Sequence, residues 1–261
     1  MLRRKPKWII AMLHVPALPG SPRSTLSWDA VGEWVMRDAE ALAAAGVDAM
    51  ILENFGDTPF YPDTVPPHTI AQMTALAVQL RRRFSIPLGI NVLRNDGRAA
   101  LAVAAASGAE FIRVNVYTGA RLTDQGIIQA RAHEIQRDRK LLSAHIAIWA
   151  DIAVKHSAPL AQRPLRDEIE DTLLRAGADA VILSGAATGK QTPLDLIEEA
   201  KAIARDKPVL AGSGVTAETI REVLARCDGA IVGTSLKTGG LPSDPVDPHR
   251  ARRIMDIVRA I

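Results

Sequence analysis

The sequence predicts one (β/α)8 barrel, the TIM-barrel fold, and three observations indicate it. The chain has 261 residues, which is the usual length of a single such barrel. Short apolar runs alternate with amphipathic segments along the whole length, as they do when parallel strands are buried on both faces. The connections that follow the strands are longer and more polar than those that follow the helices. We therefore expect residues 1–261 to form one domain without an internal boundary.

The expected strands are rich in Val, Ile and Leu and are almost continuously apolar, so each fits a buried parallel strand better than an exposed edge. The first contains the run Trp8–Leu13, and the apolar run of the last is closed by the motif that begins at Gly233. In chain order the expected strands cover residues 8–15, 48–53, 87–93, 111–117, 145–152, 180–185, 208–213 and 229–234.

A segment with helical periodicity follows each expected strand. Gly46, Gly108 and Gly177 separate three of these segments from the next strand, at the position where glycine supplies the left-handed end of a helix. The eight strand–helix pairs are the number that one barrel requires. The expected helices cover residues 28–45, 69–84, 98–107, 127–139, 165–176, 193–205, 217–225 and 249–261.

Composition narrows the classes of function. The net charge is +3 and aromatic residues are 4% of the chain, which is a poor composition for stacking and holding nucleic acid. Arg81–Arg83 and Arg252–Arg253 are the only hints of such a role, and we expect no nucleic-acid partner. No apolar run reaches the length of a membrane span. We expect a soluble, cytoplasmic protein without integral membrane association.

The long loops after the strands predict a binding site at the carboxyl ends of the strands, because these loops form the catalytic face of a (β/α)8 barrel. One of them, residues 58–67, is rich in proline and exposes aromatic residues. It could cover the site or meet a second subunit, so a homo-oligomer stays open. Lys190, in another of these loops, could reach over the site like a lid.

Two glycine motifs follow the last two expected strands. Glycine lets backbone N–H groups approach an anion, and two such loops in this position form the usual phosphate site of a barrel. Ordinary tight turns are the alternative explanation. Together the motifs favour a phosphorylated small-molecule ligand. The residues expected to hold its phosphate are Gly212, Ser213, Gly214, Gly233, Thr234 and Ser235.

Polar side chains interrupt the apolar strands near their carboxyl ends. Arg113 and Asn115 are two residues apart, so both point to the same side of a strand. A buried arginine needs a partner, and Glu53 is the first choice; a purely structural ion pair is the alternative. Asn91 and Asn115 could bind substrate or fix loops by hydrogen bonds. The candidate residues at the strand ends are His14, Glu53, Asn91, Arg113, Asn115, Asp151 and Lys155.

These residue types suit acid–base chemistry on a carbonyl compound. Glu53 or Asp151 would act as general base or acid, its pKa raised by partial burial. His14 could polarise a carbonyl or move a proton. Lys155 invites a Schiff-base lyase, in which a lysine of lowered pKa attacks the carbonyl carbon. We expect no cofactor and no metal, although a divalent ion held by Glu53, Asp151 and substrate oxygens stays an alternative.

Segments throughout the chain resemble the BtpA family. The most specific are the stretch MLHVPALPGSPR at residues 12–23 and LRND at 93–96; others are FIRVNV at 111–116, GSGVT at 212–216 and VGTSLK at 232–237. The resemblance implies a barrel of the ribulose-phosphate-binding type. The family is named after a cyanobacterial protein linked to photosystem I biogenesis, and its members in non-photosynthetic organisms have no settled activity.

Two functions follow from the residues and the resemblance together. The first is an isomerase or lyase that acts on a phosphorylated, sugar-like molecule bound at the carboxyl ends of the strands. The second is a non-catalytic assembly factor of the photosystem I biogenesis type. An open cavity lined by polar side chains would favour the enzyme, whereas a ring of polar residues satisfied wholly by internal pairing would favour the assembly factor.

Overall fold

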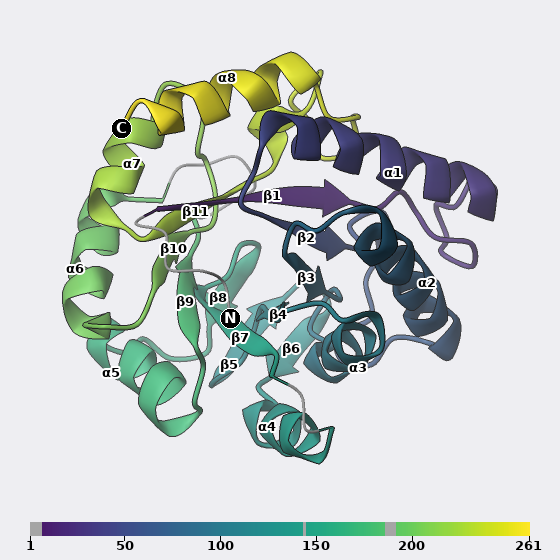
Figure 1. The fold of residues 1–261 in the computed structure, drawn as a ribbon. Helices are drawn as coiled ribbons and strands as arrows, with labels where there is room; N and C mark the ends of the chain where they lie inside the picture. Colours follow the sequence, from purple (N-terminus) through teal and green to yellow (C-terminus); the bar gives the residue numbers. More distant parts are fainter. Residues whose placement is uncertain (1–6, 143–144, 186–191) are drawn as a thin grey trace.

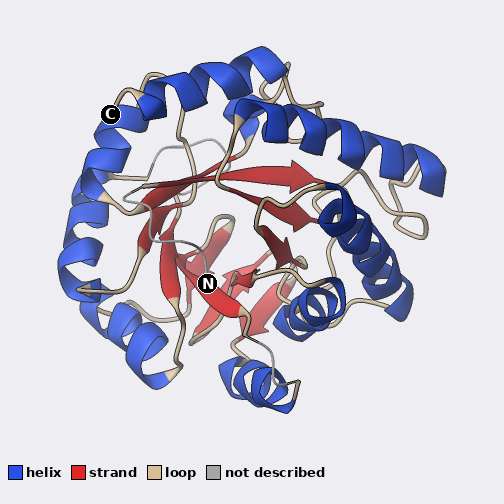
Figure 2. Cartoon of the chain, viewed as in Figure 1, coloured by secondary structure: helices blue, strands red, loops and turns tan. Residues whose placement is uncertain are grey.

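The computed structural model describes residues 7–142, 145–185 and 192–261, and eight of the strands form a closed parallel barrel. Around the barrel the order is β1-β11-β10-β9-β7-β4-β3-β2, and every neighbouring pair is parallel. Helices surround the strands (Figures 1 and 2). This architecture confirms the (β/α)8 barrel. Its strands are β1 (Trp8–His14), β2 (Ala49–Glu53), β3 (Leu88–Asn91), β4 (Phe111–Val114), β7 (Ala147–Ala153), β9 (Ala180–Leu183), β10 (Val209–Ala211) and β11 (Gly229–Val232).

The helices follow the strands in the alternation that the sequence predicts. The first begins where the Ser27 side chain accepts a hydrogen bond from the Ala30 N–H, and it ends at Gly46, whose φ of 81° closes the last turn. The α-helices are α1 (Trp28–Ala45), α2 (Pro67–Arg83), α3 (Gly97–Ser107), α4 (Ala132–Leu141), α5 (Leu165–Glu170), α6 (Leu194–Ala204), α7 (Ile220–Arg226) and α8 (Pro248–Arg259). A π-helical turn, η1 (Asp171–Arg175), extends α5, and a 3-10 turn, η2 (Thr234–Leu236), follows β11.

A small antiparallel sheet, which the sequence analysis does not predict, lies outside the barrel. Its strands are β5 (Ala120–Thr123), β6 (Gly126–Gln129) and β8 (Ser157–Pro159), in the order β6-β5-β8. The helix expected over residues 127–139 is therefore wrong in its first part, because Ile127 and Ile128 pair with β5 and α4 begins only at Ala132. The sheet links the loops that follow β4 and β7.

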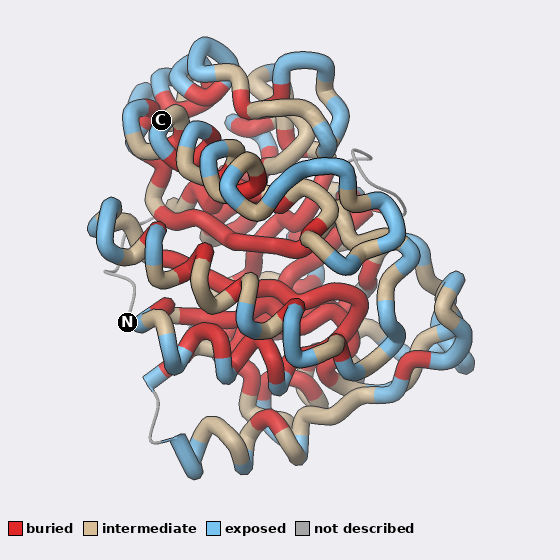
Figure 3. The backbone as a smooth tube through the Cα atoms, turned by 90° about the vertical axis from the view of Figure 1, so that its right-hand side faces the viewer, coloured by how far each residue is buried: buried red, intermediate tan, exposed pale blue. Residues whose placement is uncertain are grey.

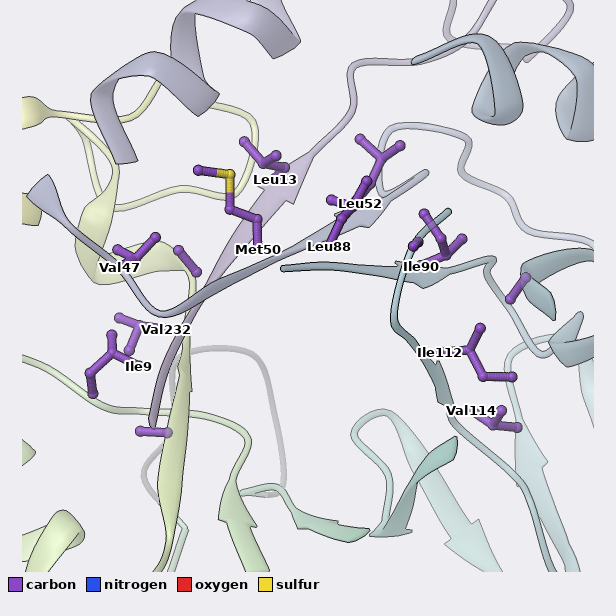
Figure 4. Close-up of a cluster of buried hydrophobic side chains, with 14 of the residues drawn as sticks. Ile9, Leu13, Val47, Met50, Leu52, Leu88, Ile90, Ile112, Val114 and Val232 are labelled. Atoms are coloured by element: carbon purple, nitrogen blue, oxygen red, sulfur yellow. The ribbon is translucent and has the colours of Figure 1, made fainter. Parts of the chain in front are cut away.

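The outward faces of the barrel strands pack against the helices, and this layer is the larger core. Alternate residues of each strand, such as Ile9 and Leu13 of β1, point outward into it. Figure 4 shows part of this cluster on neighbouring strands, and Figure 3 shows that the buried residues follow the strands through the molecule. The same alternation leaves the other residues of each strand for the barrel interior.

The barrel interior near the amino ends of the strands is filled by apolar side chains, and aromatic rings dominate this part. Phe111 of β4 stacks on Trp149 of β7, with ring centroids 3.8 Å apart, and the Trp8 ring also stacks on Trp149, with centroids 6.1 Å apart. Gly89 makes room for this stack, because a Cβ at that position would overlap the Phe111 ring. The amino end of the barrel is closed by packing, as is usual for the fold.

The first and last parts of the chain meet where the barrel closes. β1 pairs with β11, and beside this seam the fully buried Lys237 forms an ion pair with Asp38 of α1, with Nζ 2.9 Å from Oδ2. The other oxygen of Asp38 accepts a hydrogen bond from the Val246 N–H. In the parts of the chain that the structure describes, no helix is long and apolar enough to cross a membrane.

Candidate active site

The barrel interior changes from apolar to polar toward the carboxyl ends of the strands, and the two-residue period of the strands places the polar groups. On β1 the inward series is Ile10, Met12 and His14, so the histidine continues the row of core residues. Other strands repeat this order: Ala49, Ile51 and Glu53 on β2; Phe111, Arg113 and Asn115 from β4; Trp149 and Asp151 on β7; and Ala180, Ile182 and Ser184 from β9.

A cavity of about 410 Å³ opens above this polar layer, at the carboxyl ends of the strands. It is large enough for a small metabolite. The loops after β2, β3, β7, β10 and β11 contribute to its wall, as the long loops predict. The polar residues that line it are His14, Thr58, Arg94, Arg113, Asn115, Asp124, Lys155, His156, Ser213 and Thr234 together with Glu53; Phe55 and Phe60 are its aromatic residues.

Arg113 is held at the floor of the cavity by Asp151. Its Nε and Nη2 donate to the two oxygens of Asp151 at 3.0 and 3.1 Å, a bidentate pair with both side chains buried. Although burial alone would lower it, the carboxylates of Asp151 and Glu53 hold the pKa of Arg113 above its usual value. Asn115 donates to Asp151 at 2.9 Å and Ser184 donates at 3.3 Å. Asp151 is therefore fully occupied.

Glu53 forms the expected ion pair with Arg113, but it is the more distant partner, and Asp151 is the main one. Its Oε2 lies 4.0 Å from Nη1 of Arg113, whereas Asp151 contacts the guanidinium at hydrogen-bond distance. Burial raises the pKa of Glu53, against the opposing effect of the positive charges of Arg113 and Lys155. Glu53 lines the cavity and Asp151 does not. Of the two carboxylates expected to act as acid or base, Glu53 is the accessible one.

His14 lies next to Glu53, with Nε2 3.7 Å from Oε1. Burial lowers the pKa of His14 well below its usual value, and the charges of Lys237 and Lys155 act in the same direction. The imidazole is therefore neutral near pH 7. Its ring packs on Phe55, with centroids 4.8 Å apart, and a Cβ at Gly233 would lie 3.3 Å from its Cε1.

Lys155 and Arg94 bring two further positive charges to the cavity. Arg94 is 8% exposed and donates from Nη2 to the backbone carbonyl of Lys155 at 2.6 Å. Burial, with the nearby charge of Arg113, lowers the pKa of Lys155 to about 8. Lys155 follows the end of β7 and lines the cavity, as the sequence predicts for a residue at the catalytic face.

The two glycine motifs form neighbouring parts of the cavity wall, since β10 and β11 are adjacent. Gly212, Ser213, Gly214, Gly233 and Thr234 all line it. Two of the glycines also have structural reasons. Gly214 has a φ of +68°, and a Cβ at Gly212 would lie 2.5 Å from Oγ of Ser184. Glycine here is thus required by the turn and by close packing as well as compatible with an anion.

Ser235 and Asn91 lie behind the cavity wall and not at its surface. The Ser235 hydroxyl donates to the Val215 carbonyl at 2.7 Å and so ties η2 to the loop after β10. Asn91 is buried and donates to Oδ1 of Asn115 at 3.3 Å. These two candidates support residues that line the cavity, Asn115 among them.

Arg94, Asp124, Phe55 and Phe60 line the cavity and were missed as site residues. The signal for Arg94 was available, because it is a charged residue directly after a predicted strand, inside the LRND stretch. Its neighbours there have structural roles. The side chain of Asn95 donates a hydrogen bond to the Val116 carbonyl and accepts one from the Val116 N–H, and Asp96 caps α3. Phe55 lies in the loop after β2, and Phe60 belongs to the proline-rich stretch 58–67 of the same loop, which thus contributes to the cavity wall.

Metal ligands do not gather in the described part of the chain: no three His, Cys, Asp or Glu side chains there are placed to share an ion. The alternative site of Glu53 and Asp151 also meets a geometric obstacle, because Arg113, Asn115 and Ser184 occupy the Asp151 oxygens. Lys190, the expected lid residue, lies outside the residues that the structure describes.

Several solved structures share this fold, and three of them illustrate the range. KGPDC from Streptococcus mutans, in complex with a phosphorylated sugar, has a TM-score of 0.61 at 14% identity, covering 98% of this chain and 99% of that one. A KDPGal structure reaches 0.63 at 17% identity, with 100% and 98% coverage. N-(5'-phosphoribosyl)anthranilate isomerase from Pyrococcus furiosus reaches 0.60 at 13%, with 98% and 100%. At these identities the likeness shows the fold.

Sequence relatives are much closer than the structural ones. The Photosystem I biogenesis protein BtpA of Synechocystis sp. is 43% identical over 248 residues, 95% of this chain and 86% of that protein. An uncharacterized protein of Archaeoglobus fulgidus is 45% identical, covering 95% and 97%. An uncharacterized mitochondrial protein of Caenorhabditis elegans is 33% identical, covering 97% and 93%. The BtpA family model matches residues 5–260. The chain therefore belongs to the BtpA family.

Proposed function

We propose that this protein is an enzyme of the isomerase or lyase class that acts on a phosphorylated, sugar-like carbonyl compound. The observation that carries the proposal is the content of one cavity. Two glycine loops lie on one part of its wall, and three ionisable groups with shifted pKa values, His14, Glu53 and Lys155, line the same space. Shifted pKa values in a cleft are typical of catalytic sites.

The glycine loops are the proposed phosphate grip. They follow β10 and β11, the last two strands of the barrel, where backbone N–H groups of many barrels of this fold hold a phosphate. Ser213 and Thr234 add hydroxyl groups at the same wall. The sugar-phosphate complex of KGPDC supports the choice of ligand class, because that protein has the same fold.

Glu53 and His14 are the proposed proton-transfer groups. Burial raises the pKa of the Glu53 carboxyl, which suits it to exchange a proton with a ligand, and the neutral imidazole 3.7 Å away can polarise a carbonyl oxygen. Arg113 and Asn115, fixed by Asp151, would orient the oxygens of the ligand. Asp151 itself has the role of positioning Arg113 and not of a free base.

The second candidate is an assembly factor of the photosystem I biogenesis type, which the name of the Synechocystis relative favours. The internally satisfied Arg113–Asp151 cluster fits such a structural role as well. The open cavity lined by Glu53 and Lys155 favours the enzyme, because a scaffold has no need of it. Relatives of similar length in Archaeoglobus fulgidus and Caenorhabditis elegans also favour a function that does not depend on a photosystem.

A thermal-shift titration tests the proposal. We expect phosphorylated pentoses and trioses to raise the melting temperature of the purified protein in a concentration-dependent way, since a ligand that binds only the native state stabilises it by mass action. At a ligand concentration of about 100 times Kd the gain is about 2.7 kcal/mol. Ser213→Asp places a negative charge at the phosphate grip and should abolish the shift.

Ser85→Asp is the matched control. Ser85 is exposed between α2 and β3, at the opposite end of the barrel, so the same new charge should leave the shift intact. If phosphorylated compounds give no shift with a well-folded protein, the phosphate proposal is wrong, and binding to purified thylakoid proteins becomes the next measurement. If the rise in melting temperature persists in Ser213→Asp, the ligand binds at a place other than the glycine loops.

A further inference from the structure

Lys155 and Lys237 differ in their surroundings, since Lys155 is half-buried and Lys237 is fully buried. Lys237 is fully buried and is neutralised by Asp38 at 2.9 Å. Lys155 lines the cavity, and within the described ranges its ammonium group forms no ion pair and no hydrogen bond. An ammonium group that lines a cavity and has no ion-pair partner is available to react with a ligand bound there.

The surroundings of Lys155 favour the neutral amine. Burial and the positive charge of Arg113 lower its pKa to about 8, with Arg94 acting in the same direction, while Asp151 and Glu53 oppose them. A far larger share of neutral amine is therefore present near pH 7 than for an exposed lysine, and the neutral amine is the nucleophile. Lys155 is also well anchored, because Arg94 holds its backbone carbonyl at 2.6 Å.

The place of Lys155 in the barrel suits a ligand that is held by its phosphate. Two strand positions separate β7, which precedes Lys155, from β10, and three separate it from β11, so the lysine and the glycine loops enter the cavity from different sides. Glu53 comes from β2, on the side of the barrel away from β7. A ligand gripped by its phosphate would extend toward a space that both Lys155 and Glu53 line.

We propose that Lys155 forms a Schiff base with the carbonyl carbon of the ligand, an inference that rests on the proposed function. The lone pair of the neutral amine forms the C–N bond and the carbonyl π pair moves to oxygen; a proton then passes from the nitrogen to that oxygen, which gives a carbinolamine. Loss of that oxygen as water then leaves the iminium ion. The protonated Glu53 carboxyl can supply a proton to the departing oxygen, and as a carboxylate it can remove one from the carbon beside the iminium.

Reductive trapping with a small phosphorylated aldehyde tests this proposal. The protein is incubated with glycolaldehyde phosphate and sodium cyanoborohydride, which reduces the iminium to a stable secondary amine, and the labelled lysines are identified by peptide mass mapping. We expect Lys155 to be labelled at least about tenfold faster by glycolaldehyde phosphate than by glycolaldehyde, because the held phosphate positions the aldehyde. Inorganic phosphate should slow this labelling.

Two variants and an internal control make the result specific. Lys155→Arg keeps the positive charge but cannot form an imine, so the phosphate-dependent label should disappear. Lys155→Met should behave in the same way. Exposed Lys140 of α4 serves as the internal control and should react equally slowly with both aldehydes. The wild-type map alone already tests the proposal if a variant fails to fold.

The outcomes separate this inference from the proposed function. If glycolaldehyde phosphate raises the melting temperature but leaves Lys155 unlabelled, the Schiff base is wrong and the phosphate site stands. If Lys155 reacts no faster than Lys140, the Schiff base is equally wrong. If there is neither a thermal shift nor a label, both the Schiff base and the proposed function are wrong.

Discussion

At the scale of single residues, the cavity contains two carboxylates in different situations. Asp151 accepts hydrogen bonds from Arg113, Asn115 and Ser184, so its charge is fully compensated. Glu53 has only more distant neighbours, His14 at 3.7 Å and Arg113 at 4.0 Å, and burial raises its pKa. One carboxylate is suited to holding a cation in place and the other to exchanging a proton.

Glu53→Gln tests this difference through the pH dependence of stability. Because the folded pKa of Glu53 lies above its ordinary value of 4.5, the folded state binds more protons than the unfolded state between these two values. Stability therefore falls as pH rises through that window, and the loss is complete above the folded pKa. The neutral glutamine lacks this loss, so Glu53→Gln should become more stable than wild type as pH rises.

The expected gain is roughly 1.4 kcal/mol for each pH unit that separates the folded from the unfolded pKa. Melting temperatures of both proteins from about pH 4 to pH 9 measure it, because this range begins near the ordinary pKa of a glutamate and extends well above it. Glu33→Gln, at an exposed position on α1, is the control and should run parallel to wild type. If the melting temperatures of Glu53→Gln and wild type run parallel over this pH range, the pKa of Glu53 is not raised.

The sequence predicted which residues meet at the site better than it predicted their partners. Arg113 and Asn115 face the same side because strand side chains alternate, and both contact Asp151. Choosing between Glu53 and Asp151 requires the strand order, since β4 pairs with β7 in a register that sets Arg113 opposite Trp149. That pairing places Asp151 just above Arg113 on the neighbouring strand. It is a long-range fact, which a local pattern does not contain.

At the scale of elements, β3, β4 and β7 pack together closely because one position, Gly89, has no side chain. Gly89 of β3 leaves the space that the Phe111 ring fills, and Phe111 in turn stacks on Trp149 at 3.8 Å. The glycine thus belongs to the apolar layer that lies directly beneath Arg113 and Asp151 in the barrel interior. The polar layer depends on the apolar layer below it, because the two alternate along the same strands.

Gly89→Ala should therefore destabilise the protein. The new Cβ would overlap the Phe111 ring, and overpacking of this kind costs about 1–3 kcal/mol. Urea unfolding measures the loss, and adding Phe111→Leu should recover part of it. Gly32→Ala is the control: in α1 the nearest atom to its Cβ is 3.9 Å away, so helix propensity should make it neutral or stabilising by up to about 1 kcal/mol. Equal stability of Gly89→Ala and wild type would contradict the packing argument.

Elements with strong local signals were predicted well, and those formed by distant pairing were not. The expected helix over residues 28–45 coincides with α1, which has a capping serine at one end and a glycine at the other. Residues 127–139 were expected to be helical throughout, because two isoleucines fit an apolar helix face as well as a strand. In the structure Gly126–Gln129 pairs with β5, and β5 pairs with β8, whose residues come 34 to 38 positions later in the chain than their partners.

At the scale of the whole molecule, closure of the barrel joins the two ends of the chain. β1 and β11 pair along the seam, and the buried Lys237–Asp38 ion pair connects α1 with the segment that leads to α8. Lys237 belongs to the VGTSLK stretch, whose glycine and threonine line the cavity. The same segment thus forms part of the site and fastens it to the first helix.

Removing one partner of this pair should be far more damaging than removing both. Lys237→Met leaves the Asp38 carboxylate buried without a counter-charge, which typically costs about 3–5 kcal/mol. Combining it with Asp38→Asn removes that charge and keeps an oxygen for the Val246 N–H, so the double variant should recover much of the loss. Urea unfolding of the single and double variants provides the double-mutant cycle.

An exposed ion pair supplies the reference for this cycle. Arg253 and Glu218 lie 3.0 Å apart with side chains 67% exposed, so Arg253→Met should cost about 1 kcal/mol or less. If Lys237→Met lowers the free energy of unfolding no more than Arg253→Met does, the buried ion pair does not stabilise the junction between β1 and β11. If the double variant is as unstable as Lys237→Met, the loss comes from packing and not from the unpaired charge.

The aromatic stack below the site gives the molecule a built-in optical reporter. Trp149 is 2% exposed, lies on Phe111, and precedes Asp151 by two residues on the same strand. The indole therefore sits directly under the charges that a bound anion would rearrange, while Trp28 and Trp34 belong to the outer helix α1. Its fluorescence should change when a ligand fills the cavity, so ligand binding can be followed in the unlabelled protein by intrinsic tryptophan fluorescence.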